Sequence, residues 1–110
     1  MHHRKTEIYR QTLELLRLCR LTVESLPPGY AFLSDQLRRA SSSILLNFAE
    51  GNGKSTPKER RRFFRIAKAS AYEVAAIFDT AQSFAPIKKT QTQNGADLCD
   101  HIAAMLSKYR

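Results

Sequence analysis

A helix-start signal followed by a long apolar repeat limits the fold more than any other feature of this chain. Thr56-Pro57-Lys58-Glu59 is a capping box with proline at the first helical position, a motif that pairs two backbone N–H groups that a helix start otherwise leaves free. The repeat that follows runs at three- and four-residue steps for three heptads and consists of Phe63, Ile66, Ala67, Ser70, Val74, Ile77, Ala81 and Phe84. Pro86 interrupts it. We therefore predict one long helix over residues 57–84, buried along one face.

Three further segments show the period of an amphipathic helix. The first covers residues 5–25 and ends before Pro27-Pro28-Gly29, since proline disfavours helix in the preceding residue. The second covers residues 34–50, with Ser34 as the expected N-cap and Gly51 as the expected stop. Its apolar residues occupy more than one stripe, as in a helix that also lies in an interface between copies.

The last segment with this period is a helix over residues 92–109. Its start is open between Thr90 and Ala96, because Asn94-Gly95 can form either a turn or the interior of a helix. Four apolar stripes joined by three short connections predict an all-α fold, an antiparallel up-down-up-down four-helix bundle. At 110 residues the chain is expected to form a single domain, residues 1–110.

The composition is that of a globular protein, because 43% of the residues are hydrophobic, which excludes a disordered chain. The start MHHRKTEIYR has no apolar run behind it, so we expect no signal peptide, and no stretch approaches the ~20 apolar residues of a membrane helix. Cys19 and Cys99 lie far apart within helical patterns. We interpret them as reduced core thiols of a cytoplasmic protein rather than as a disulfide or a ligand pair.

Positive charge is concentrated in the middle of the chain. The net charge is +8, and residues 38–68 contribute nine Lys/Arg against two acids. Such asymmetry is typical of a protein with a polyanionic partner. At about 100° per residue, the basic side chains of helix 57–84 are expected to lie opposite its apolar repeat, facing solvent or a partner. The candidate nucleic-acid-binding residues are Lys54, Lys58, Arg61, Arg62, Arg65 and Lys68.

Three interpretations of this basic strip remain open: contact with the phosphates of RNA or DNA, contact with a protein partner or another copy, and plain solvation. Phosphate contact would be non-specific and steeply dependent on salt. No aromatic platform, zinc knuckle or recognition-helix turn is visible on the strip, so we predict no readout of bases. In an oligomer, several copies of the strip would strengthen a weak contact by avidity.

Polar residues on the packing faces of two helices form a second candidate group. Because buried polar groups need hydrogen bonds, Ser43, Asn47 and Ser70 are expected to bond between helices or to backbone. Glu50 lies in the last turn of its helix, where the helix dipole disfavours a negative charge. It therefore needs a nearby cation, and the candidates are Arg38, Arg39 and Arg62. Glu73 is expected to pair with an arginine of residues 34–50.

The full polar group contains Gln36, Arg38, Arg39, Ser43, Asn47, Glu50, Ser70 and Glu73. One interpretation is a pocket for a ligand or partner. The other is a structural polar network that fixes how the helices align, which is a common use of buried polar groups.

Several of these residues carry a resemblance that covers nearly the whole chain. They are Gln36-Leu37-Arg38-Arg39-Ala40, Ser43, Asn47, Ala49-Glu50-Gly51, Phe63, Ile66-Ala67, Ser70 and Glu73. In this pattern the chain resembles the 23S rRNA intervening-sequence protein family of small bacterial four-helix bundles. It departs at Ala69, where a glycine is common, and lacks a tyrosine near Asn94. The resemblance implies a homopentamer. A more distant similarity, to accessory variability proteins of diversity-generating retroelements, implies binding of a reverse transcriptase and nucleic acid.

No pattern of residues indicates catalysis. The histidines His2, His3 and His101 have no metal-ligand spacing with the cysteines, and GNGK at 51–54 lacks the strand that precedes a phosphate-binding loop. We therefore expect no enzyme, no metal and no cofactor. The first functional hypothesis is an oligomer that binds RNA or DNA through the basic strip. The alternative is a protein-interaction scaffold or accessory subunit whose arginines meet an acidic protein partner.

Overall fold

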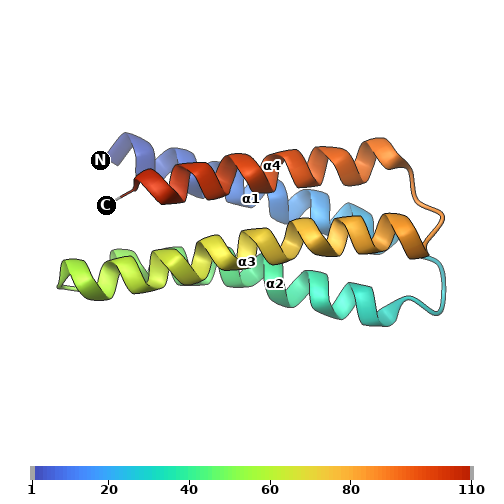
Figure 1. The fold of residues 1–110 in the computed structure, drawn as a ribbon, viewed down its shortest axis with the longest axis horizontal. Helices are drawn as coiled ribbons and strands as arrows, with labels where there is room; N and C mark the ends of the chain where they lie inside the picture. The colour runs from blue at the N-terminus through green and yellow to red at the C-terminus, as the bar shows by residue number, and fades with distance from the viewer. Residues whose placement is uncertain (1, 110) are drawn as a thin grey trace.

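The structure is a computed structural model that describes residues 2–109, and these form four helices (Figure 1). They are α1 (His2–Ser25), α2 (Ala31–Asn52), α3 (Pro57–Phe84) and α4 (Lys89–Lys108). Each helix runs antiparallel to the one before it, and α4 packs back against α1, which closes the bundle. The molecule is a rod with extents of 45 × 21 × 17 Å. The predicted all-α up-down-up-down bundle is confirmed.

The two ends of the rod carry different parts of the chain (Figure 1). The end of α2 and the start of α3 lie at the same end as the start of α1 and the end of α4. The α1–α2 and α3–α4 connections lie at the opposite end. The basic residues at the start of α3 therefore lie close to the last turn of α4, although more than 35 residues separate them in the sequence.

The core runs along the whole rod and follows the predicted three- and four-residue period. Large side chains from every helix are fully buried in it; they include Ile8, Leu15, Leu37, Ile44, Phe48, Val74, Phe78 and Ile102. Each side chain of this size contributes roughly 1.5–3 kcal/mol when it leaves water. Among residues 2–109, every buried side-chain nitrogen or oxygen has a hydrogen-bond partner. The bundle is therefore held by a continuous apolar core without unpaired polar groups inside it.

The buried stripe of α3 differs from the predicted one. Phe64 is 4% exposed, whereas Phe63 is only half-buried and Phe84 is 64% exposed. The ring of Phe64 lies 5.7 Å from that of Phe48 and 5.0 Å from that of Tyr109, so contacts with α2 and α4 select it. The prediction that Phe63 and Phe84 belong to the core is wrong, because spacing along α3 alone could not distinguish Phe63 from Phe64.

Three of the four helices begin three residues earlier than predicted, at His2, Ala31 and Lys89. Ser34 is not the N-cap of α2: it is buried, and its N–H donates to the carbonyl of Tyr30 at 3.3 Å, inside the first turn. Tyr30 occupies the cap position without a side-chain capping bond. Its hydroxyl instead donates to the carbonyl of Phe84 at 2.7 Å. The residue before α2 is thus held by a contact with a distant residue, and no side chain within residues 2–109 caps the start of the helix.

Gly51 does not stop α2, contrary to the prediction. The helix continues to Asn52, and Gly53 occupies the C-cap position. A Cβ atom on Gly51 would lie 2.6 Å from Cε1 of Phe64, so the glycine lets α2 and α3 approach closely. Gly95 has the same role inside α4, where a Cβ would lie 2.5 Å from the ring of Phe78. Both glycines are therefore sites of helix packing rather than turns.

The predicted bounds of α3 match the structure. The Thr56 hydroxyl accepts a hydrogen bond from the Glu59 N–H at 3.2 Å, and Pro57 takes the first helical position. The Glu59 carboxylate accepts the Thr56 hydroxyl at 3.0 Å rather than a backbone N–H. One backbone N–H is therefore capped here, not the two that the capping box predicted.

The two cysteines are buried, free thiols, as predicted. Burial raises the pKa of the Cys19 thiol to about 12, although a hydrogen bond with Ser41 opposes the shift. Burial also raises the pKa of Cys99. Both thiols therefore stay protonated and unreactive near neutral pH.

Candidate nucleic-acid interface

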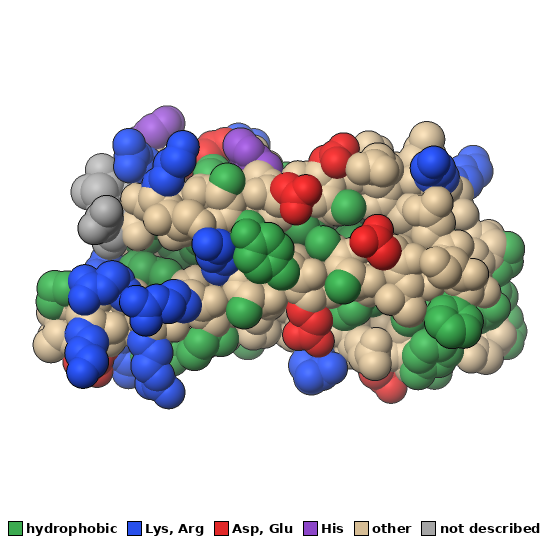
Figure 2. Space-filling model, viewed as in Figure 1, with side chains coloured by type: hydrophobic (Ala, Val, Ile, Leu, Met, Phe, Trp, Pro, Cys, Tyr) green, Lys and Arg blue, Asp and Glu red, His purple; other side chains and the backbone are tan. Residues whose placement is uncertain are grey.

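Six basic side chains gather where α2 ends and α3 begins. We call them the basic cluster: Lys54, Lys58, Arg61, Arg62, Arg65 and Lys68. Lys58, Arg61, Arg62 and Arg65 are exposed, while Lys54 and Lys68 are half-buried. Figure 2 shows basic side chains crowded over the start of α3, at one end of the rod. The structure thus brings all six predicted residues to one end of the molecule.

Most of this charge has no acidic partner. Of the five salt bridges among residues 2–109, one involves the basic cluster: the Lys54 Nζ lies 3.1 Å from the Glu50 carboxylate. The prediction that an arginine neutralises Glu50 is therefore wrong. Lys54 lies just past the end of α2, so its side chain can reach back to Glu50 in the last turn. The other five cations of the cluster remain free to meet an anion from outside.

Arg60 belongs to the same basic run but points into the protein. Its Nη1 donates to the carbonyl oxygens of Asn52 at 3.1 Å and Gly51 at 3.4 Å, the last residues of α2. Its guanidinium also lies 5.5 Å from the centre of the Phe64 ring. The carbonyls at a helix end lack partners within the helix, so Arg60 satisfies them and neutralises the negative end of the dipole. This arginine has a structural role.

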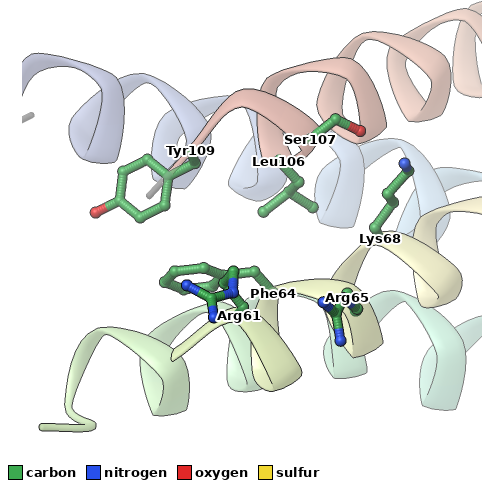
Figure 3. Close-up of a pocket in the computed structure, with 7 residues that line it drawn as sticks. All are labelled: Arg61, Phe64, Arg65, Lys68, Leu106, Ser107 and Tyr109. Atoms are coloured by element: carbon green, nitrogen blue, oxygen red, sulfur yellow. The ribbon is translucent and has the colours of Figure 1, made fainter. Parts of the chain in front are cut away.

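A groove of about 300 Å³ lies between α3 and α4 beside the cluster (Figure 3). Seven side chains line it: Arg61, Phe64, Arg65 and Lys68 from α3, with Leu106, Ser107 and Tyr109 from α4. Phe64, Leu106 and Tyr109 are buried and form its floor, whereas the cations stand at its edge. In Figure 3 Lys68 extends toward α4, while Arg65 points away from it.

Two members of the basic cluster, Arg61 and Lys68, lie nearer the core than predicted, because they border a groove whose floor is part of it. Lys58 and Arg62 are exposed and do not line this groove. The burial of Phe64 in place of Phe63 brings the core to that side of the first turns of α3. Most of the rest of the predicted stripe is buried as expected: Ala67, Ser70, Val74, Ile77 and Ala81. Arg61, Arg65 and Lys68 thus lie at the α3–α4 boundary.

Hydrogen bonds hold this end of the bundle together. The Tyr109 hydroxyl donates to Oδ1 of Asn52 at 2.6 Å, and Nδ2 of Asn52 donates to the Phe48 carbonyl at 2.8 Å. Burial raises the pKa of the Tyr109 phenol, while Arg60 and Asn52 oppose the shift. The end of α4 is therefore tied to the end of α2 behind the basic cluster, which gives the cluster a rigid support.

Three residues of the predicted polar group form one hydrogen-bonded chain. The hydroxyls of Ser43 on α2 and Ser70 on α3 lie 2.8 Å apart. Nδ2 of Asn47 donates to the hydroxyl of Ser43 at 2.9 Å and to its carbonyl at 2.8 Å. This chain joins α2 to α3 and leaves none of its buried donors free, which is the arrangement expected of a bond that aligns two helices.

The other members of the polar group lie on the surface in separate pairs. Arg39 lies 3.7 Å from Glu73, an ion pair between α2 and α3, and Arg38 lies 3.8 Å from Asp35. Gln36 is exposed and makes no side-chain hydrogen bond within residues 2–109. Exposed pairs of this kind contribute ~0–1 kcal/mol. The eight residues therefore do not converge on a single pocket.

Comparison with protein families matches residues 4–108 to the 23S rRNA-intervening sequence protein family. The chain belongs to this family. The family that the residue pattern predicted is confirmed, and the match extends over all four helices. No curated protein matches the chain.

One solved structure has the same fold as this chain. It is the crystal structure of a protein with unknown function from the S23 ribosomal protein family of Bacteroides thetaiotaomicron. The two superpose with a TM-score of 0.79 over 90% of this chain and 94% of the other, at 20% sequence identity. At this identity the likeness concerns the fold alone.

Two aromatic side chains lie beside the cluster and were not predicted from the sequence to do so. The Phe63 ring lies 5.2 Å from both the Lys54 Nζ and the Arg62 guanidinium. Tyr72, which is 53% exposed, has the Lys68 Nζ 5.9 Å from its ring centre. The prediction of no aromatic platform on the strip is therefore wrong. The signal for Tyr72 was its position four residues after Lys68, on the same face of α3.

Within residues 2–109, no three His, Cys, Asp or Glu side chains come together as a metal-binding set. None of the helices in that range carries an apolar stretch long enough for a bilayer crossing.

Proposed function

We propose that this family member is a non-enzymatic protein that binds the backbone of RNA or DNA through the basic cluster. The observation that carries the proposal is the presence of five cations near one end of α3 without acidic partners. Lysine and arginine in such an arrangement attract phosphates by releasing the counterions that nucleic acid holds. The support of the cluster by Arg60 and Tyr109 favours a preformed surface.

We also propose that it acts as a homo-oligomer, a pentamer as the family resemblance implies, in the bacterial cytoplasm. Leu46 is 67% exposed on α2, a helix whose apolar residues extend beyond the core, and this supports a contact between copies. The two reduced, buried thiols support a reducing compartment. Several copies of the basic cluster in one assembly would raise the affinity for a long strand by avidity.

The same cations support a second candidate function, an accessory subunit or scaffold that binds an acidic protein partner. A reverse transcriptase is the partner that the more distant resemblance to retroelement proteins implies. Unpaired arginines bind carboxylates as well as phosphates, so charge alone fits both functions. The two proposals differ in whether nucleic acid binds at physiological salt without a protein partner.

Fluorescence anisotropy with RNA and DNA probes across a salt series tests the proposal. The variant Arg61→Glu/Arg65→Glu/Lys68→Glu removes three exposed or half-exposed cations of the cluster. The matched control is Arg20→Glu/Lys88→Glu/Lys89→Glu, which alters the net charge equally with exposed residues outside the cluster.

We expect the wild type and the control to bind in the micromolar range, with an affinity that falls steeply as salt rises. For the cluster variant we expect the salt slope for a single strand to decrease by roughly 2, since each lost phosphate contact contributes about 0.7. Equal losses in both variants would show that net charge alone drives the binding. Absence of binding by the folded wild type at moderate salt would favour the protein scaffold.

A further inference from the structure

A single row of four side chains runs along α3, and the first three of them line the α3–α4 groove. Arg61, Arg65, Lys68 and Tyr72 are spaced by four, three and four residues, so they follow one face of the helix. From first to last the row spans about 16 Å, at 1.5 Å per residue. Three cations are thus followed by one aromatic ring, in a line whose length suits a few nucleotides.

Tyr72 differs from the other aromatic residues near the cluster. Phe64 and Tyr109 are buried in the floor of the groove, and the Phe63 ring lies against two cations. Tyr72 is 53% exposed, and its hydroxyl makes no hydrogen bond within residues 2–109. Its one cationic neighbour is the Lys68 Nζ, 5.9 Å from the ring centre, near the limit of a cation–π contact. A ring face of Tyr72 is therefore open to a flat partner.

The charges around this row also limit what can bind. Beyond Tyr72, α3 carries Glu73 and Asp79 and no Lys or Arg, and the antiparallel α4 carries Asp97 and Asp100 beside that part of α3. Figure 2 shows acidic side chains across the middle of this face. The cations on this face of α3 therefore form a short stretch, from Arg61 to Lys68, that ends before Tyr72. This stretch suits one phosphate backbone better than the two backbones of a duplex.

We propose that this row binds single-stranded nucleic acid, with an unpaired base stacked on Tyr72 and the neighbouring phosphates on Arg61, Arg65 and Lys68. Exposed aromatic rings beside a positive groove bind single strands in this way, because every base has a π-face that stacks. A base inside a duplex has both faces covered and cannot reach the ring. Lys68 moves from the ring to a phosphate when the base stacks. This inference rests on the proposed function and adds the class of nucleic acid and the stacking residue.

Affinities for three probes test the inference: a short oligodeoxythymidylate, an abasic strand of equal length and a duplex. The variants are Tyr72→Ala, Tyr72→Phe and the control Tyr9→Ala, which removes an exposed tyrosine of α1 that is 43% exposed. We expect Tyr72→Ala to weaken oligodeoxythymidylate binding roughly 5- to 150-fold, the range measured for loss of one base stack. Binding of the abasic strand and the duplex should not change. Tyr72→Phe keeps the ring and should keep the affinity.

A fluorescence measurement gives a second, independent readout. The chain has no tryptophan, so Tyr72→Trp introduces a single tryptophan at the proposed stacking position, and its emission can be excited apart from that of the tyrosines. We expect oligodeoxythymidylate to quench this tryptophan and the abasic strand to leave it unchanged. The control Tyr9→Trp should respond to neither strand.

The outcomes separate the inference from the proposed function. If the wild type binds none of the probes at low salt, the proposed function fails and the inference fails with it. If it binds all three probes with steep salt dependence and Tyr72→Ala alters nothing, the stacking inference alone is wrong. The inference is also overturned if light scattering shows that Tyr72→Ala changes the assembly state, since Tyr72 then belongs to a contact between copies.

Discussion

The two parts of α3 share one core but have different surfaces. Residues 57–68 carry six Lys or Arg and one acid, whereas residues 69–84 carry two acids and no Lys or Arg. Both parts contribute buried side chains to the core. They include Phe64 and Ala67 in the first part, and Val74 and Phe78 in the second. The Thr56 cap, Pro57 and the buried stripe account for the helix, so the fold does not require the positive charge.

Packing of the core explains the inner face of both parts of α3, but it does not explain why the cations are found on one part only. A helix that needed charge only for solubility would carry both signs along its whole exposed side. On α3 the cations are confined to the end that Arg60 and Tyr109 stabilise, and the exposed aromatic ring of Tyr72 lies at the boundary between the two parts.

The largest effect is expected from truncating the inner face of α3. Phe64→Ala and Phe78→Ala should each lower the free energy of unfolding by about 3–5 kcal/mol, because both remove a buried ring and leave a cavity. Phe84→Ala is the matched control: the ring is 64% exposed, so we expect a change within about 0.5 kcal/mol. Urea denaturation at constant protein concentration measures all three. A loss at Phe84 as large as at Phe78 would contradict the assigned stripe.

The glycines that face the two parts of α3 should also respond alike. Gly51→Ala and Gly95→Ala each place a Cβ within 2.6 Å of a phenylalanine ring, so we expect a loss of about 1–3 kcal/mol from overpacking. Gly53→Ala meets its nearest atom at 3.5 Å and has a helical φ of −87°, so it should be neutral or slightly stabilising. Thermal unfolding distinguishes the three variants. A stabilised Gly51→Ala would mean that the two helices separate more easily than their packing indicates.

A smaller effect is expected where α2 joins α3 through the serine pair. Ser43→Ala removes the partner of the Ser70 hydroxyl and one acceptor of Asn47, which should cost about 1 kcal/mol of stability. Binding of nucleic acid should be unchanged, because this chain of hydrogen bonds fixes helix alignment. Ser42→Ala, which loses only a bond to the Arg39 carbonyl of its own helix, is the control. A selective loss of binding in Ser43→Ala would instead assign a pocket to the polar group.

The smallest effect is expected from extending the basic row into the second part of α3. Ala76→Lys/Asp79→Lys continues the same face with two exposed positions. We expect a few-fold gain in affinity for a single strand at low salt, and a salt slope steeper by roughly 1. Glu24→Lys/Ser25→Lys on α1 gives the same change in net charge at exposed positions. If this control gains as much affinity, the position of the charge has no importance.

The residues of the candidate site were predictable, but the groove beside them was not. The six basic residues follow from composition and spacing, and the structure brings them to one end of the rod. The groove beside three of them depends on which phenylalanine is buried, because Phe64 forms part of its floor. Phe48 and Tyr109, which are far from Phe64 in the sequence, decide that by packing against it. The groove and the partner of Glu50 likewise required the positions of other side chains.

The sequence by itself determined the four helices, their order and the bounds of α3, because the Thr56 cap, Pro57 and the apolar period act between near neighbours. Tertiary structure decided that Gly51 continues a helix and that Tyr30 replaces Ser34 at the start of α2. It also decided that three residues of the basic cluster border a groove beside α4. Caps, prolines and apolar periods indicate the structure that a segment favours on its own. Contacts across the bundle override them wherever packing between helices stabilises the chain more than a cap or a turn does.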